Sequence, residues 1–305
     1  MKDLLKLDND EFKVEMKTRT AHIEEILKSY LPENITQQKT IYDAMEYSLM
    51  AGGKRLRPML MLEAYRLFGG KDESIVTPFM AAIEMIHTYS LVHDDLPAMD
   101  NDDYRRGRKT THIVYGEDMG ILAGDALLNY AYETVAKSMA SGGKLKLQAK
   151  AFAVLSQKAG IYGMVGGQVV DVEMTGKDLS EDQLEFIYRL KTGALLEASL
   201  MTGAVLAGAS DEEVRAMEEV GRNVGMAFQI QDDILDITST TEELGKPVHS
   251  DEKNAKSTYV AIYGMDESLK AVEEYSEKAL NILLEFDMQN AYLNSLIEML
   301  INRKK

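Results

Sequence analysis

The stretch HTYSLVHDDLPAMDNDDYRR, residues 87–106, decides how the rest of the chain must fold. It places five aspartates within ten residues and follows them with Arg105 and Arg106. Clustered carboxylates repel one another, so a folded protein keeps them together only where water solvates them or cations neutralise them. The stretch therefore predicts either a solvated acidic face or a cation site.

The segment before these aspartates is apolar and periodic. Apolar residues recur there at steps of three and four, which predicts a helix. His87 and Asp94 are seven residues apart, so they share one face of it. Pro97 should end the helix just past the first two aspartates. We therefore expect a core helix whose C-terminal end carries carboxylates into a cavity.

A second acidic cluster, QIQDDILD, occupies residues 229–236. Asp232 and Asp236 are four residues apart and Gln229 is one turn earlier, so all three share one side of a helix. Oxygen-only clusters suit hard cations such as Mg²⁺, which bridges one or two carboxylates to substrate phosphates. Two such clusters facing each other would hold a diphosphate.

Composition narrows the possible functions. The chain has 305 residues, of which 45% are hydrophobic, so it can bury a large core. It contains no cysteine, which excludes disulfides, thiolate metal sites and a cysteine nucleophile. The formal net charge of −16 argues against nucleic acid or an anionic membrane as partner. An anionic substrate must therefore be held by local cations.

Neither a targeting signal nor a membrane span is expected. Residues 1–15 are charged throughout, so we expect no signal peptide and a cytoplasmic location. The most membrane-like run, residues 192–209, is interrupted by Glu197 and is rich in Gly and Ala. A transmembrane helix needs about 20 mostly apolar residues. We therefore expect a core helix there.

Helical periodicity runs through nearly the whole chain, without convincing strand alternation or a linker. Pro58 suits the first position of one helix, and Thr77–Pro78 suits the N-cap and first position of another. The expected architecture is one all-α domain, residues 1–305, built as a helical bundle around a central cavity. The expected helices cover residues 12–31, 38–50, 58–68, 77–94, 117–140 and 144–174, with one capped by Ser180, one opened by Asp211 and two after residue 258. The helix at residues 144–174 has weak spots at Gly160, Gly163, Gly166 and Gly167.

Two basic runs could bind anions. GGKRLRP, residues 52–58, places three cations beside a helix start, where exposed N–H groups and the helix dipole favour negative charge. RRGRK, residues 105–109, directly follows the acids. Acidic patches next to basic ones suit a metal-bridged polyphosphate, because metal ions take some oxygens and guanidinium groups take others.

Each signal has a simpler interpretation when taken alone. A DDxxD on an amphipathic helix is more often a solvated face, and GGKRLRP is more often a turn before a basic helix. His87 alone is more often a core histidine. Their joint occurrence is more specific, because nothing structural explains acids placed where a core should be.

In this order, GGKRLRP, DDLPAMDNDDYRRG, KTG, FQIQDDILD and LGK resemble the motifs of the short-chain trans-isoprenyl diphosphate synthases, and most closely those of the bacterial farnesyl diphosphate synthases. The resemblance spans residues 40–260. It implies an all-α bundle around a central cavity, a homodimer, and Mg²⁺ at three ions per site. The implied substrates are isopentenyl diphosphate and an allylic diphosphate, either dimethylallyl or geranyl.

The resemblance also implies roles for single residues, which fall into metal-binding and substrate-binding sets. The metal-binding set is Asp94, Asp100 and Asp232 with Asp95 and Asp236 in support; the allylic set is Arg105, Lys191, Thr192, Gln229 and Lys246; the isopentenyl diphosphate set is Lys54, Arg57, His87 and Arg106.

Two positions depart from the family's pattern. Lys109 stands where relatives usually have Pro, and Ala255 stands before Lys256 where Gly is expected. Both lie in loops, so they bear on loop closure rather than on chemistry.

The implied mechanism is ionisation, condensation and elimination. Mg²⁺ and basic residues stabilise the departing pyrophosphate. Oxygen dipoles from Thr192 and Gln229, with a carbonyl near Lys191, stabilise the allylic cation that the double bond attacks. Loss of a proton ends the step, so no side-chain nucleophile is needed.

Helix geometry bears on product length. Tyr89 and Ser90 lie one turn before Asp94, roughly 6–7.5 Å along the helix axis. A tyrosine there would stop the growing chain, and in the resembling family this pattern goes with the fifteen-carbon product, farnesyl diphosphate. The simpler interpretation is that Tyr89 only packs.

Other functions stay open. Within the class, the alternative is a geranylgeranyl diphosphate synthase. A terpene cyclase also uses aspartate-bound Mg²⁺ in a helical bundle, but it needs no second diphosphate site. An inactive partner subunit or a cation-binding helical protein is the alternative from another class.

Overall fold

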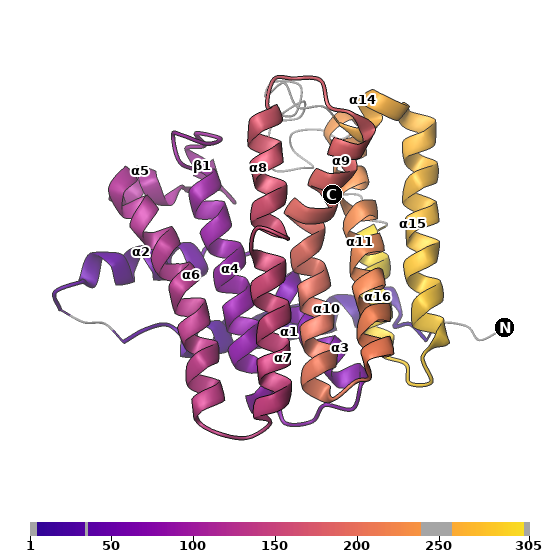
Figure 1. Ribbon diagram of the computed structural model, residues 1–305, viewed down its shortest axis with the longest axis horizontal. Helices are drawn as coiled ribbons and strands as arrows, with labels where there is room; N and C mark the ends of the chain where they lie inside the picture. The colour runs from indigo at the N-terminus through magenta and orange to yellow at the C-terminus, as the bar shows by residue number, and fades with distance from the viewer. Residues whose placement is uncertain (1–4, 34–35, 239–257, 302–305) are drawn as a thin grey trace.

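The computed structural model describes residues 5–33, 36–238 and 258–301, and nearly all of their regular structure is helical (Figure 1). The predicted all-α bundle is confirmed. The helices are α1 (Asn9–Ser29), α2 (Lys39–Leu49), α3 (Leu56–Leu67), η1 (Glu73–Ile75), α4 (Thr77–Asp94), α5 (Thr111–Tyr115), α6 (Glu117–Ala140), α7 (Leu145–Ala159), α8 (Met164–Met174), α9 (Glu181–Ile187), η2 (Tyr188–Gly193), α10 (Ala194–Ala207), α11 (Asp211–Thr238), α14 (Tyr259–Tyr263), α15 (Met265–Glu285) and α16 (Ala291–Ile301).

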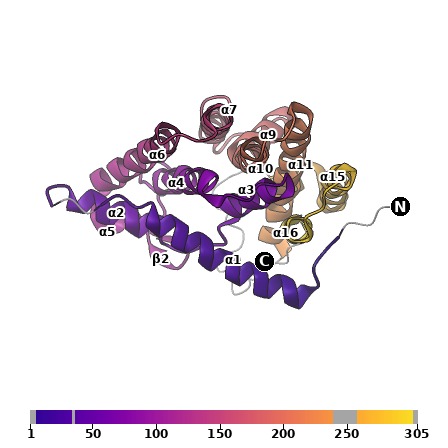
Figure 2. The same cartoon turned by 90° about the horizontal axis from the view of Figure 1, so that it is seen from below.

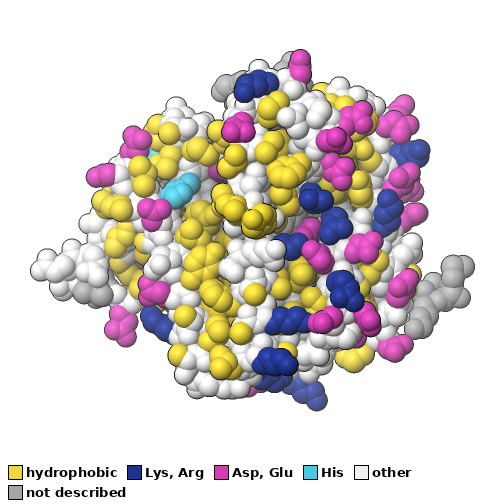
Figure 3. Space-filling model, viewed as in Figure 1, with side chains coloured by type: hydrophobic (Ala, Val, Ile, Leu, Met, Phe, Trp, Pro, Cys, Tyr) yellow, Lys and Arg dark blue, Asp and Glu magenta, His cyan; other side chains and the backbone are white. Residues whose placement is uncertain are grey.

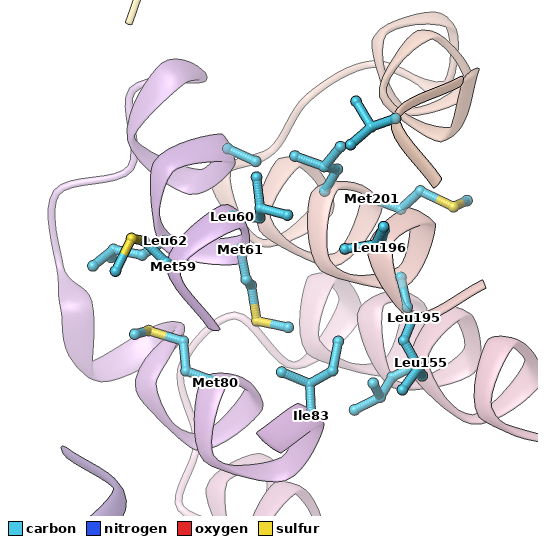
Figure 4. Close-up of a cluster of buried hydrophobic side chains, with 14 of the residues drawn as sticks. Met59, Leu60, Met61, Leu62, Met80, Ile83, Leu155, Leu195, Leu196 and Met201 are labelled. Carbon is cyan, nitrogen blue, oxygen red and sulfur yellow. The ribbon is translucent and has the colours of Figure 1, made fainter. Parts of the chain in front are cut away.

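Helix α10 forms the centre of the bundle. Every residue from Ala194 to Leu206 is buried, and α3, α4, α7 and α11 surround the helix (Figure 2). Gly203 allows α3 to approach closely, because a Cβ atom there would lie 2.2 Å from the carbonyl oxygen of Met61. Side chains of α3, α4, α7 and α10 interdigitate around this contact (Figure 4). One hydrophobic cluster contains residues from Ile23 to Ile301, and the single domain expected for residues 1–305 stays a prediction.

The apolar run at residues 192–209 lies inside the protein, as predicted. Among the described residues, the helical stretch Glu181–Ala207 has the length and composition to cross a membrane, and 83% of its most apolar window is buried in the bundle. Glu197 is buried as well, where it pairs with Lys158. A carboxylate neutralised in this way can remain inside the core.

The single helix predicted for residues 144–174 is wrong, because α7 and α8 are separate helices. The chain breaks at Gly160–Gly163, and a Cβ atom at Gly163 would lie 1.9 Å from the carbonyl oxygen of Lys158. Only glycine fits so close a backbone approach. The break frees α8 to pack against η2.

Smaller predictions also need correction. Val76 rather than Thr77 is the N-cap of α4, and Pro58 is the third residue of α3. Within residues 258–301 the structure has three helices rather than two. Residues 104–109 form a hairpin of two-residue strands, β1 (Tyr104–Arg105) and β2 (Arg108–Lys109), where no strand was expected.

Candidate active site

The first aspartates lie at the C-terminal end of α4, as predicted. The helix ends at Asp94, three residues before Pro97. The following turn folds back, because the N–H of Asp100 donates to the carbonyl oxygen of Asp94 at 2.8 Å. The structure therefore brings Asp94, which is half-buried, next to the exposed Asp100.

Asp95 contacts Arg105 instead of facing the same way as Asp94. Its carboxylate is only 3% exposed and accepts from Arg105 Nε at 2.8 and 3.0 Å, with Arg105 Nη2 at 2.6 Å. Arg–carboxylate pairs of this kind fix geometry as well as charge. The metal role of Asp95 and the substrate role of Arg105 stay predictions, and the structure gives the two residues an ion pair with each other.

A cavity of about 670 Å³ starts beside Asp94 and runs back along α4. Tyr89 and Ser90 both line it, as the helix geometry predicted. Tyr89 is 7% exposed, and burial raises its pKa to about 12, so the hydroxyl stays protonated. Apolar side chains from α6 and α8 form part of the wall: Ile121, Met164, Val165, Val169 and Val172.

Lys191 and Thr192 lie on η2, which is a single π-helical segment. Such segments are rare and often mark functional sites, because they change which way consecutive side chains point. Both residues line the large cavity and also a smaller one of about 120 Å³ beside α11. Thr192 Oγ1 donates to Gln229 Oε1 at 2.8 Å. The two cavities therefore meet at η2.

The second acidic cluster borders the smaller cavity. Gln229 lines it, and so does Asp233, which the sequence analysis left out. Asp233 accepts from the hydroxyl of Tyr188 and, at 2.7 Å, from the N–H of Tyr259. Asp232, one residue earlier, is half-buried, and Asp236 is 3% exposed.

Helix α8 supplies two further polar residues that the sequence analysis missed. Gln168 Nε2 donates to Asp94 Oδ1 at 2.6 Å. One turn later, Asp171 Oδ2 accepts from Lys191 Nζ at 2.5 Å. The signal was GGQVVD, a polar pair three residues apart in a glycine-rich apolar helix. Gly167 permits the approach, because a Cβ atom there would lie 2.3 Å from the backbone nitrogen of Lys191.

The four residues predicted for isopentenyl diphosphate come together in a second pocket, of about 480 Å³, which we call the basic pocket. Two buried residues join it that the sequence analysis did not single out. Arg55, in the left-handed region at φ 50°, donates to Glu84 Oε1 and to the carbonyl oxygen of Leu49, both at 2.8 Å. The charged and titratable side chains lining the basic pocket are Lys54, Arg55, Arg57, Glu84, His87 and Arg106.

Burial and mutual repulsion shape the charges in the basic pocket. Burial lowers the pKa of Arg57 to about 10, against the attraction of Glu84. Burial, followed by the charges of Arg57 and Arg106, holds the pKa of His87 well below its usual 6.5. Arg57 and His87 also line the large cavity, so the basic pocket and that cavity adjoin.

The carboxylates of Asp94 and Asp100 are suitable ligands for Mg²⁺. Among residues 5–33, 36–238 and 258–301, no three His, Cys, Asp or Glu side chains are placed to share one ion. Mg²⁺ needs only one or two carboxylates when phosphate oxygens and water supply the remaining ligands. Asp94 and Asp100, brought together at the cavity rim, fit that requirement. Lys246, Ala255 and Lys256 lie outside the described residues.

Comparisons with known proteins agree with this geometry. The polyprenyl synthetase family matches residues 38–298, so the chain belongs to that family. It is 45% identical over 286 residues to a geranylgeranyl diphosphate synthase of Cyanophora paradoxa, covering 93% of this chain and 94% of the relative. It is 43% identical over 281 residues to a farnesyl diphosphate synthase of Geobacillus stearothermophilus, covering 92% and 94%.

A solved structure is similar across nearly the whole chain. The geranyltransferase of Helicobacter pylori, complexed with magnesium and isoprenyl diphosphate, aligns with a TM-score of 0.82 at 31% identity, covering 97% of this chain and 98% of that one. The membership in the short-chain trans-isoprenyl diphosphate synthases that the motifs implied is confirmed.

The basic pocket generates a pH prediction. Because the pKa of His87 lies below 6.5 in the folded protein, the unfolded chain takes up the proton first as pH falls. The free energy of unfolding is therefore unaffected by His87 above about pH 6.5, and it falls as the pH drops below that value, because the unfolded chain binds the proton more readily. Histidine NMR, with His87→Asn to assign the signal, should show His87 neutral at pH 6, and added pyrophosphate should raise its pKa. An ordinary pKa in the free protein would contradict this account.

Proposed function

We propose that this protein condenses isopentenyl diphosphate with an allylic diphosphate and that its end product is farnesyl diphosphate. One observation carries the proposal: a basic pocket adjoins an apolar cavity that has carboxylates at its rim. The basic pocket suits a diphosphate held without metal, and the rim suits a diphosphate held through metal. The apolar cavity suits a hydrocarbon tail.

The basic pocket would hold isopentenyl diphosphate. Lys54, Arg57 and Arg106 supply its cations, and Arg57 Nε is buried without a hydrogen-bond partner among the described residues. An unpartnered buried donor is costly, and a phosphate oxygen would satisfy it. His87, neutral in the free pocket, can donate one ring N–H to the same anion. The double bond would then extend from this pocket toward the large cavity.

The allylic diphosphate would lie at the rim. Asp94, Asp100 and Asp232 would hold magnesium there, and the ions would neutralise the charge of the diphosphate as its bond to carbon breaks. Gln168 orients the Asp94 carboxylate, and Asp171 orients Lys191. Thr192 and Gln229 place oxygen dipoles at the junction of the two cavities, where the allylic cation would form.

The condensation can proceed without a nucleophile from the protein. The allylic carbon–oxygen bond breaks and releases pyrophosphate, and the electron pair of the isopentenyl double bond forms the new carbon–carbon bond. The resulting cation loses a proton to the pyrophosphate, and a double bond re-forms. No Ser, Cys or Lys nucleophile is needed for these steps.

Tyr89 supports the fifteen-carbon product. It is nearly fully buried at the wall of the cavity and packs edge-to-face with His93, with ring centroids 5.8 Å apart. Gly124 supports His93 closely, because a Cβ atom there would lie 2.0 Å from its Nε2. A ring held from behind can limit chain growth. The geranylgeranyl product is the second candidate, because the relative from Cyanophora paradoxa carries that name.

We also propose that two copies pair through the face formed by α6 and α8. Figure 3 shows apolar side chains gathered there, and Ile161 and Tyr162, between α7 and α8, are 70% and 75% exposed. Ile121 and Val169 continue the surface and line the mouth of the large cavity. Such a face favours an interface over solvent. The cytoplasmic location expected from the sequence stays a prediction.

Incorporation of radiolabelled isopentenyl diphosphate tests the activity. With dimethylallyl or geranyl diphosphate and Mg²⁺, the protein should form labelled farnesyl diphosphate, and EDTA should abolish the reaction until Mg²⁺ is restored. Asp94→Asn should lower turnover by roughly a hundredfold or more. Asp103→Asn, an exposed acid in the same run, is the matched control. Full turnover in EDTA would contradict a metal-held diphosphate.

Substitution of Tyr89 tests the product length. Tyr89→Ala should open the cavity and shift the products, separated by chromatography, toward twenty carbons and more. Tyr89→Phe keeps the ring and should leave the products unchanged. An unchanged product distribution in Tyr89→Ala would defeat the assignment of Tyr89 as the stop.

Sedimentation equilibrium tests the interface. The protein should sediment as a dimer, and the double substitution Ile161→Asp and Tyr162→Asp should give monomers. Val14→Asp, at an exposed apolar position on α1, should leave the dimer intact. A monomeric parent protein, or a dimer that survives the double substitution, would exclude this face.

A further inference from the structure

The hairpin β1–β2 connects the two diphosphate sites. Its consecutive residues Arg105 and Arg106 diverge, because Arg106 has a left-handed backbone with φ 53°. Arg105 turns to the buried Asp95 at the end of α4, and Arg106 turns into the basic pocket. The position of this hairpin therefore determines where the guanidinium groups of both Arg105 and Arg106 lie.

Three hydrogen bonds join the hairpin and the residue shortly after it to α2 and the loop that follows α2. The Tyr47 hydroxyl donates to the carbonyl oxygen of Lys109 at 2.7 Å. Ser48 Oγ and Thr111 Oγ1 are 2.8 Å apart just beyond the hairpin. Arg106 Nη1 donates to the carbonyl oxygen of Gly52, in the loop that follows α2.

Tyr47 makes the largest of these contacts. The guanidinium carbon of Arg108 lies 4.3 Å from the centroid of the Tyr47 ring, within the range of a cation–π interaction. The ring of Tyr115 packs edge-on against the ring of Tyr47, with the two centroids 5.6 Å apart. Tyr47 also lines a small pocket together with Asp95 and Arg105. Its ring and its hydroxyl thus both hold strand β2 of the hairpin.

The guanidinium group of Arg106 is closely packed and has little room to move. A Cβ atom at Gly53 would lie 2.6 Å from Arg106 Nη1, so the guanidinium packs directly on the glycine backbone. A hairpin displaced from α2 could not keep this contact. By fixing the hairpin, Tyr47 therefore also fixes the position of Arg106 in the basic pocket.

We propose that Tyr47, which lies outside every motif quoted above, is a positioning residue for the isopentenyl diphosphate site and acts through Arg106. The proposal rests on the function proposed for the basic pocket. It also accounts for the lysine at position 109, because Tyr47 contacts the backbone carbonyl there and not the side chain. Arg105 depends less on Tyr47, since Asp95 holds it directly.

Steady-state kinetics of the full chain with both substrates test this proposal. Tyr47→Phe should raise KM for isopentenyl diphosphate by roughly fivefold, the worth of one neutral hydrogen bond. Its kcat and its KM for the allylic diphosphate should stay within about twofold of the parent protein, since no contact to that site is removed directly. Tyr47→Leu, which also removes the ring under Arg108, should have a larger effect in the same direction. Tyr42→Phe on the same helix is the matched control, because no hydrogen bond of its hydroxyl exists among the described residues.

A double-mutant cycle separates positioning from general stability. In an Arg106→Ala background, Tyr47→Phe should add no further increase in KM for isopentenyl diphosphate, because its effect passes through the missing guanidinium. Additive effects would overturn the proposal. So would an unchanged KM in Tyr47→Phe, or equal increases for both substrates with a lowered Tm. An inactive parent protein would instead refute the proposed function, which keeps the two failures distinct.

Discussion

Repulsion among the cations of the basic pocket is the constraint on which the site depends. Lys54, Arg55, Arg57 and Arg106 converge within a protein of net charge −16, where Arg55 is buried and Arg57 is half-buried. Left alone, buried like charges would open the structure. The buried Glu84 carboxylate and the carbonyl oxygens of Leu49 and Gly52 counter this repulsion.

The compensation is incomplete, and that incompleteness favours binding of an anion. Glu84 and Glu24 both pair with Arg55, at 2.8 and 3.7 Å, yet Arg57 Nε keeps no hydrogen-bond partner among the described residues. Burial is the main reason why the pKa values of Arg57 and His87 are lowered, and neighbouring guanidinium charges lower them further. A diphosphate would supply that charge, and an overall negative protein therefore can bind a strongly negative substrate.

Close helix packing performs a different task, which is to bring helices α8 and α11 against η2. A Cβ atom at Gly225 would lie 2.7 Å from Cα of Gly193, and one at Gly167 would meet the backbone of Lys191. Helices α8 and α11 can thus lie directly against the π-helical turn of η2. That turn then serves both cavities through Lys191 and Thr192. Glycine is required at these contacts because any side chain would separate the helices.

The sequence by itself determined the helical class, most helix positions and the candidate residues. Periodicity and caps are local properties, so α6 and the capping box of Ser180 and Gln183 could be predicted from neighbouring residues alone. Gly160 and Gly163 were predicted as weak spots of one helix, but the complete break between two helices was not, because it depends on a backbone contact that periodicity does not record. It also missed the hairpin, whose two-residue strands carry no alternation.

Only the tertiary structure decided which of the acids and bases face one another. Asp94 and Asp95 are adjacent in sequence, yet one borders the cavity and contacts Gln168 while the other pairs with Arg105. Consecutive residues on a helix differ by about 100° in direction, so their partners depend on which helices pack nearby. Tyr47, Glu84 and Asp171 acquire their partners in the same way, from segments remote in sequence. Residue type and spacing specify what chemistry is possible, and packing decides where each charge finds its counter-charge.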